Sequence, residues 1–138
     1  IDELAADGHT VEYHLVNFLD NPGTDNYSSR AANAATCVAE ESPENSLDFI
    51  GELFASYNTH QGAGLSNEEI ERVASDVGAD ISDCVSDNTY RPFADYTTAK
   101  AIEAGIAGTP SVWVGGEYYE NTGGGETFQE FAESQLEG

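Results

Sequence analysis

A helical spacing of apolar positions dominates the middle of the chain. Ser28 can cap a helix that runs to Ala39 and carries Cys37 in its last turns. Ser42 and Pro43 supply a cap and a first-turn proline for a second helix. The apolar residues of this second helix share one face, and they are Leu47, Ile50, Leu53, Phe54 and Tyr57.

Three further helical segments complete this block. Ser66 and Glu69 have the spacing of a capping box, in which side chain and backbone at the two positions bond each other. A short helical turn over residues 80–85 carries Cys84. A helix over residues 91–104 follows, and its predicted inward positions are Phe93, Tyr96, Thr97 and Ala101.

Before the helical block, the pattern predicts the end of a helix and then a strand. Residues 1–8 have apolar positions on one helical face and end at a glycine, but no capping residue precedes Ile1. We therefore expect the chain to start inside a helix whose first turns are missing. Residues 10–18 are rich in branched and aromatic side chains, which is typical of a strand.

After the helical block, the pattern predicts a hairpin and a last helix. Residues 112–114 and 117–119 flank a Gly-Gly pair, which is a strong signal for a two-residue hairpin turn. Thr127 and Glu130 form a second capping box, and the helix behind it is predicted to bury Phe128, Phe131 and Leu136. The predicted order of elements is therefore the end of a helix, a strand, a helical block, two strands and a last helix.

Composition limits the classes of partner. The chain has 138 residues, which is the length of one domain that can bury a core. Its 26 acidic residues against four basic ones give a formal net charge of -22. Such a surface repels phosphate backbones, so nucleic acids are not expected as partners. We interpret most of the acidic residues as a solvated surface.

The cysteines and histidines do not form a recognisable metal site. Cys37 and Cys84 are the only cysteines, and they do not form a Cys-x-x-Cys motif. The histidines lack metal-ligand spacing relative to the cysteines, so no metal or cofactor is expected. An acidic cation-binding module is a remote alternative, because the candidate ligands lack EF-hand spacing: Asp76, Asp80, Asp83 and Asp87. For the two cysteines, a disulfide and two buried free thiols both remain open.

A proline stands directly in front of the first hairpin strand. Pro110 has no backbone N–H, and in sheets proline is confined to strand starts, edges and bulges. From the residues alone, this proline forms either an ordinary rigid entry turn or a tight turn with a cis Thr109–Pro110 bond.

Three stretches carry a resemblance to a known family. They are Gly108 to Gly116 (Gly-Thr-Pro-Ser-Val-Trp-Val-Gly-Gly), Tyr27 to Ala35, and Gly64 to Ser66. Together with the order of elements, they resemble the DsbA-like branch of the thioredoxin superfamily, in its actinobacterial secreted or membrane-tethered type. The resemblance implies a thioredoxin-like α/β fold with a helical insertion at residues 21–96. Residues 1–20 and 97–138 would form the thioredoxin part, without its N-terminal strand and the start of its first helix.

The resemblance also assigns roles to individual residues. It implies that the Thr109–Pro110 bond is cis and that Pro110 faces the active-site dithiol and lines the peptide-binding groove. Thr109 takes the position whose backbone such proteins offer to an extended substrate. Cys37 and Cys84 would form a second, structural disulfide inside the insertion. The catalytic Cys-x-x-Cys would lie upstream of residue 1, so no catalytic residue is expected in this chain. Trp113 is expected in the core, and a place in the substrate site beside Thr109 and Pro110 is the alternative.

The implied function is that of an extracytoplasmic thiol-disulfide oxidoreductase or isomerase, secreted or tethered to the cell membrane. Its expected partners are unfolded or cysteine-containing secreted proteins and a membrane reoxidase or reductase. A redox-inactive thioredoxin-fold module that binds or supports other proteins is the alternative. A fold lacking its first strand would expose a sheet edge, so a homodimer through that edge is a further expectation.

Overall fold

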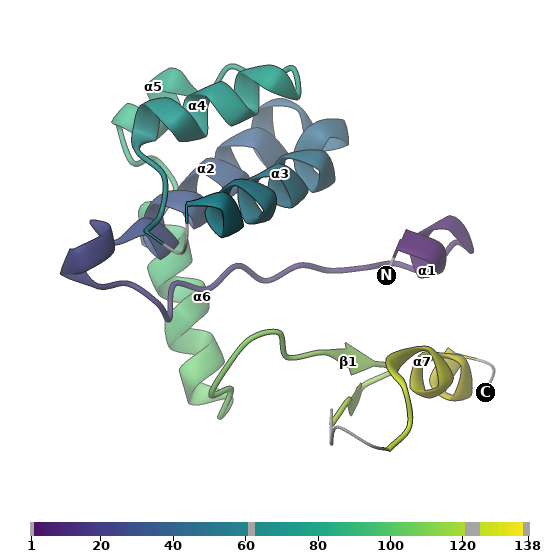
Figure 1. The fold of residues 1–138 in the computed structure, drawn as a ribbon. Coiled ribbons are helices and arrows are strands. Elements are labelled where there is room, and N and C mark those ends of the chain that lie inside the picture. Colours follow the sequence, from purple (N-terminus) through teal and green to yellow (C-terminus); the bar gives the residue numbers. More distant parts are fainter. Residues whose placement is uncertain (1, 61–62, 121–124, 137–138) are drawn as a thin grey trace. The chain divides into compact units, whose positions relative to one another are not determined.

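A computed structural model of the chain describes residues 2–60, 63–120 and 125–136 (Figure 1). The chain divides into two compact units, Ile1–Glu103 and Ala104–Gly138. The division predicted from the sequence, with an insertion at residues 21–96, follows the family resemblance and stays a prediction. No helix among the described residues has the length and apolar content that crossing a membrane requires.

The first unit is helical, and its longest helix lies at its centre. The helix α2 contacts α3, α4, α5 and α6 (Figure 1). The alanines that dominate the buried face of α2 have small side chains, which allows its neighbours to approach closely. The elements of this unit are α1 (Asp2–Ala6), η1 (Pro22–Thr24), α2 (Tyr27–Glu41), η2 (Pro43–Asn45), α3 (Ser46–Thr59), α4 (Asn67–Asp76), α5 (Ser82–Ser86) and α6 (Arg91–Glu103).

The predicted inward face of α3 is partly wrong. Phe49 is fully buried and packs in the core with Leu53 and the α4 residue Ile70. Phe54, which the pattern assigned to the same apolar face as Leu53, is 68% exposed, and Leu47 is exposed as well. Apolar residues occur around most of α3, so its period alone did not select the side that faces α2.

The predicted inward face of α6 needs a similar correction. Phe93 and Tyr96 are exposed, while the buried residues of α6 are Ala94, Thr98 and Ala101. These three follow one another at helical spacing on the side that packs in the unit. The small side chains on α6 and α2 meet, and the large aromatic side chains are left outside.

The strand predicted over residues 10–18 is absent. Within Ile1–Glu103, the described residues form no strand, and residues 9–16 run as an extended segment without a ladder (Figure 1). Branched and aromatic side chains favour extended backbone, but a strand also needs a neighbour to which its backbone groups bond. Such a neighbour is not among the described residues of this unit.

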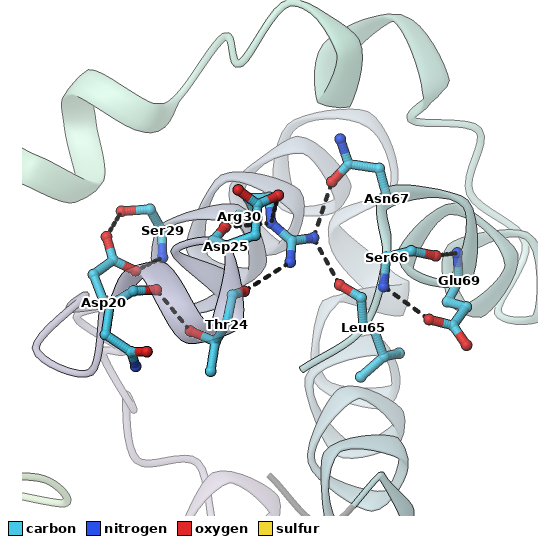
Figure 2. Close-up of polar contacts among 10 residues, drawn as sticks. Asp20, Thr24, Asp25, Ser29, Arg30, Leu65, Ser66, Asn67 and Glu69 are labelled. Atoms are coloured by element: carbon cyan, nitrogen blue, oxygen red, sulfur yellow. Dashed lines mark hydrogen bonds and ion pairs between the residues drawn. The ribbon is translucent and has the colours of Figure 1, made fainter. Parts of the chain in front are cut away.

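The predicted caps of the first two long helices are also wrong. The helix α2 begins at Tyr27, so Ser28 lies inside its first turn, and Asn26 is at the cap with a positive φ of 51°. Ser42 makes no side-chain cap bond. In contrast, the capping box before α4 is confirmed. The Ser66 N–H donates to Glu69 Oε2 at 2.8 Å, and the Glu69 N–H donates to Ser66 Oγ at 3.2 Å (Figure 2).

Arg30 joins three segments of the first unit (Figure 2). Its guanidinium donates from Nη1 to the Leu65 carbonyl oxygen at 2.7 Å and from Nε to the Asp25 carbonyl oxygen at 2.9 Å. It also donates to Oδ1 of Asn67 at 3.1 Å. The guanidinium lies over the Tyr27 ring, 5.6 Å from the centroid. A mostly buried cation is satisfied here mainly by backbone oxygens, and it holds the start of α4 against α2.

The second unit is a hairpin with one helix. It contains β1 (Trp113–Val114), β2 (Glu117–Tyr118) and α7 (Phe128–Leu136). The predicted hairpin is confirmed, with Trp113 opposite Tyr118 in an antiparallel pair. Gly115 and Gly116 have φ values of 59° and 92°, which a two-residue turn of this kind requires and which glycine adopts without strain.

The last helix is held to the hairpin through aromatic contacts. The Tyr119 ring meets Phe128 edge-on at 5.5 Å and lies 5.3 Å from Phe131 between ring centroids. Both phenylalanines are half-buried, and the fully buried residue of α7 is Ala132. The predicted capping box is confirmed, because Thr127 N–H donates to Glu130 Oε2 at 2.9 Å and Glu130 N–H donates to Thr127 Oγ1 at 3.3 Å.

Replacing Glu130 by glutamine is expected to make the stability of the protein less sensitive to acid. The backbone N–H and then the hydroxyl of Thr127 bond the Glu130 carboxylate and hold its pKa below the ordinary value of 4.5. A carboxyl whose pKa is lowered by folding stabilises the fold above its unfolded pKa, and this stabilisation is lost as the pH falls through the folded pKa. The melting temperatures of wild type and Glu130→Gln should therefore converge as the pH falls below 4.5. A difference that stays constant from neutral to acid pH would contradict this.

Candidate functional site

The turn that carries Thr109 and Pro110 lies in the second unit, directly before β1. The Thr109–Pro110 peptide bond is cis. The Ser111 hydroxyl donates to the Gly108 carbonyl oxygen at 2.7 Å, which closes the turn around the two residues between them. Both Thr109 and Pro110 are exposed, so the turn presents its surface to solvent.

An aromatic pair follows the turn on the hairpin. Trp113 and Tyr118 lie opposite each other in the strand register, and their ring centroids are 4.9 Å apart. Trp113 is 48% exposed, so the expectation that it is a core residue is wrong. The buried strand residue is its neighbour Val114, because successive side chains of a strand point to opposite faces. The strand β1 contacts α7.

The two cysteines form a disulfide in the first unit. The bond joins Cys37 on α2 to Cys84 on α5, which decides between the two open interpretations of these residues. Only 2% of Cys37 is exposed. Next to this bond, the Tyr90 N–H donates to Oδ1 of the buried Asn33 at 2.7 Å, which ties the chain after α5 to α2. Cys84 is half-buried. Both cysteines of the chain are therefore engaged in a cross-link, which suits a structural role.

The sequence-predicted site residues lie in two places. Thr109 and Pro110 share the turn of the second unit, and Cys37 and Cys84 share the disulfide of the first. Nothing in the geometry tests the predicted contact of Thr109 and Pro110 with a substrate, which stays a prediction. Among the described residues, no three histidine, cysteine or acidic side chains come together in a way that could hold a metal ion.

An apolar groove of about 360 Å³ runs over α2 and α3 in the first unit. The Tyr27 and Tyr57 rings are stacked in it, with centroids 5.5 Å apart. Gly64, at a φ of 82°, leaves room for this stack, since a Cβ there would lie 2.7 Å from the Tyr27 ring. Burial raises the pKa of the Tyr27 phenol to about 12, and the nearby Arg30 cation only partly opposes this. The phenol is therefore neutral at physiological pH.

Comparisons with known proteins give the family. The sequence model of a family described as Thioredoxin matches residues 3–134 of the chain. A crystal structure of reduced DsbA from Mycobacterium tuberculosis is similar with a TM-score of 0.65 and 30% sequence identity. The chain is a DsbA-like member of the thioredoxin superfamily. The predicted thioredoxin-like α/β fold class is thereby confirmed.

This DsbA-like chain covers only part of each relative. The similarity to the Mycobacterium tuberculosis DsbA spans 77% of this chain and 55% of the DsbA chain. The serine/threonine-protein kinase PknE of Mycobacterium tuberculosis and that of Mycobacterium bovis are each 35% identical over 127 residues. That match covers 83% of this chain and 22% of the kinase.

Several residues that organise this DsbA-like chain were not found from the sequence. Arg30 had a signal, because it is one of four basic residues among 26 acidic ones and a rare cation in such a chain is a candidate for a buried partner. Asn17 and Thr98 had no signal. They bond each other across 81 positions of the chain, and neither belongs to a motif.

Proposed function

We propose that the protein containing this chain is a thiol-disulfide oxidoreductase that acts outside the cytoplasm on cysteine-containing secreted polypeptides. The observation that carries the proposal is the likeness to a DsbA, at 30% identity and a TM-score of 0.65. DsbA proteins are strong thiol oxidants because their reduced form is stabilised. Secreted chains that must form disulfides are the natural substrates of such chemistry.

In this proposal the exchanging dithiol belongs to a part of the protein outside residues 1–138. The 55% coverage of the DsbA chain leaves room for such a part. A substrate thiolate attacks the protein's disulfide, forms a mixed disulfide and releases one protein thiolate. A second substrate thiolate then attacks the substrate sulfur of the mixed disulfide, which yields a substrate disulfide and the reduced dithiol. A membrane partner reoxidises this dithiol to the disulfide. Where the protein works as a reductase or isomerase, the membrane partner instead reduces the disulfide form to the dithiol.

Thr109 and Pro110 are assigned to the substrate groove beside that dithiol. Both residues are exposed, and the bond from Ser111 to Gly108 closes the turn that holds them. An extended polypeptide would pair with the backbone at Thr109, in the manner of an added strand. The location outside the cytoplasm is supported by the Cys37–Cys84 disulfide, because structural disulfides persist mainly in oxidising compartments.

A second candidate is a redox-inactive thioredoxin-fold module that binds polypeptides. The observation that favours it is the 35% identity to part of PknE, whose name describes a protein kinase and not an oxidoreductase. Such a module would keep the turn of Thr109 and Pro110 as a binding surface. It would bind an unfolded chain without changing the redox state of that chain.

The test is a turnover assay on the full-length protein. It should oxidise a reduced, unfolded ribonuclease, or reduce insulin, faster than the uncatalysed reaction. Replacing Thr109 by tryptophan should lower kcat/KM by about tenfold or more, because a large side chain at the turn obstructs an extended substrate. Thr10→Trp, at an exposed position of the first unit, is the matched control and should keep wild-type turnover.

Two outcomes would count against the proposal. Turnover that stays at background in both assays would favour the binding module, particularly if a reduced, unfolded chain still bound the protein. Equal activity of Thr109→Trp and wild type would remove the turn from the substrate groove, even if the protein is an oxidoreductase.

A further inference from the structure

A histidine lies where α3 ends, beside the start of α4. His60 follows the last residue of α3, and the two helices contact each other inside the first unit. The ring nitrogen Nδ1 of His60 lies 2.8 Å from the Ser56 carbonyl oxygen, one turn back along the chain. The other ring nitrogen, Nε2, lies 3.2 Å from Glu69 Oε1 on α4. The ring therefore bridges the two helices.

Both atoms that the ring nitrogens face are hydrogen-bond acceptors. A carbonyl oxygen and an ionised carboxylate have no proton to donate, so each of the two bonds needs an N–H on the ring. The Thr59 hydroxyl, 3.4 Å from Nδ1, donates its own proton to the Ser56 carbonyl oxygen at 2.8 Å. A neutral imidazole has one N–H, whereas the imidazolium has two. Only the protonated ring of His60 can make both bonds at once.

Glu69 also belongs to the capping box of α4. Its Oε2 accepts from the Ser66 N–H at 2.8 Å (Figure 2), which leaves Oε1 for His60. The backbone and then the side chain of Ser66, and after them the His60 ring, hold the pKa of the Glu69 carboxyl below its ordinary value of 4.5. The carboxylate is therefore ionised over the whole range in which a histidine titrates.

Glu69 is the charged group that faces His60 from the neighbouring elements. The helix α3 also packs against α2 and η2, and among the residues that the structure describes neither places a charged side chain on the ring. Arg72, three residues further along α4, makes no ion pair with Glu69 in that part of the chain. The bond to the Ser56 carbonyl oxygen first, and Glu69 after it, raise the pKa of His60 above its ordinary value of 6.5.

A second contact holds the start of α4 without titrating. Arg30 donates from Nη1 to the Leu65 carbonyl oxygen, and a guanidinium keeps its charge throughout the physiological range. Gly64, next to Leu65, lies against the Tyr27 ring. Of the contacts made through Arg30 and through His60, only the one through His60 depends on pH.

We propose that His60 is a pH-sensitive clasp, which joins the end of α3 to the capping box of α4 when its ring is protonated and releases the capping box when the ring is neutral. The clasp does not depend on the proposed function. A histidine whose pKa is raised by folding stabilises the fold fully below the unfolded pKa, and this contribution is lost as the pH rises through the folded pKa. The clasp is therefore closed in mild acid. Above the folded pKa of His60, the start of α4 depends on the contact from Arg30 to Leu65.

The first experiment titrates the histidine ring signals of the full-length protein by NMR. In wild type, the midpoint of His60 should lie above 6.5. In Glu69→Gln, which keeps an oxygen for the Ser66 N–H but removes the charge, this midpoint should fall towards 6.5. Glu12→Gln is the matched control, because Oε1 of Glu12 lies 3.1 Å from Nε2 of the exposed His14. It should leave the midpoint of His60 unchanged.

The second experiment follows the start of α4 by amide hydrogen exchange. The protection factor of the Ser66 N–H, which corrects for the intrinsic effect of pH on exchange, should fall by about threefold as the pH rises from about 5 to about 8. His60→Gln keeps a donor on the side chain but cannot gain a charge. In this variant the protection factor should not change over the same range of pH.

The outcomes that overturn the clasp are distinct from those of the turnover assay. A midpoint of His60 that does not move in Glu69→Gln would mean that the ring is not bonded to the carboxylate. A constant protection factor in wild type would mean that protonation of His60 does not reach α4. The same pH dependence in wild type and His60→Gln would assign the effect to another group. Each of these results overturns the proposal, whether or not the protein proves to be an oxidoreductase.

Discussion

Replacing Cys37 and Cys84 together by alanine is expected to lower the free energy of unfolding by about 4 kcal/mol. The disulfide closes a loop across 47 positions, and a cross-link of that span removes much of the conformational freedom of the unfolded chain. It also ties the short helix α5, which has five residues, to the central helix α2. Without the bond, α5 depends on its few apolar contacts, such as that of the buried Val85.

Urea denaturation followed by circular dichroism would measure this loss. The wild-type protein under reducing conditions serves as the control, because it lacks the cross-link but keeps both side chains. Its stability should approach that of the Cys37→Ala and Cys84→Ala double variant. A loss below about 1 kcal/mol in both would show that the bond does not stabilise the fold in the expected way.

Replacing Phe49 by alanine is expected to cost about 3–5 kcal/mol, whereas Phe54→Ala should change stability by no more than about 0.5 kcal/mol. The two residues have the same side chain and lie on the same helix, but Phe49 is 0% exposed and Phe54 is 68% exposed. Truncation at Phe49 removes buried apolar surface and leaves a cavity beside Leu53 and Ile70. Truncation at Phe54 removes surface that is already in contact with water.

The comparison is measured by thermal or urea unfolding of the two variants beside wild type. Because the substitution is the same, differences in the unfolded chain largely cancel. The reverse order of costs would mean that α3 packs through its other side in the whole protein, where Phe54 and the apolar groove beside it would be covered. Similar costs for both variants would mean that α3 is buried on two sides.

The burial of Cys37 bears on the proposed chemistry. Thiol-disulfide exchange requires a thiolate to reach a sulfur atom, and Cys37 is almost inaccessible in the fold. The Cys37–Cys84 bond should therefore persist while an accessible dithiol elsewhere in the protein exchanges with substrates. Labelling of free thiols before and after a turnover assay would show which cysteines exchange. Cys37 and Cys84 should stay unlabelled, and the accessible dithiol should be labelled when it is reduced.

Several features that depend on bonds over a few residues were predicted correctly from the sequence, although the single caps at Ser28 and Ser42 were not. The capping boxes at Ser66 and at Thr127 each need only an acceptor and a carboxylate three residues apart. The hairpin at Gly115 and Gly116 needs two residues that adopt positive φ. Each of these motifs has two positions that support each other, which is why its residues identify it better than a single capping residue does.

Features that depend on residues far apart in the chain could not be predicted from the sequence pattern. The spacing of apolar residues along α3 is compatible with burial of either of two sides of the helix. Only packing against α2 decides that Phe49 is buried and Phe54 is exposed. Residues 10–18 have the side chains of a strand, but pairing decides whether extended backbone becomes one. The family resemblance supplied the pairing of Cys37 with Cys84, which the two residues alone left open.

The same distinction between local and distant interactions holds for the residues around the candidate site. The helical block, the hairpin with its last helix and the excess of negative charge follow from the order of residues, because each reflects local geometry or composition. The joining of Asn17 to Thr98, the surroundings of Arg30 and the exposure of Trp113 were decided by the tertiary structure. These depend on which surfaces meet when segments far apart in the chain pack together, and packing is a property of the whole fold.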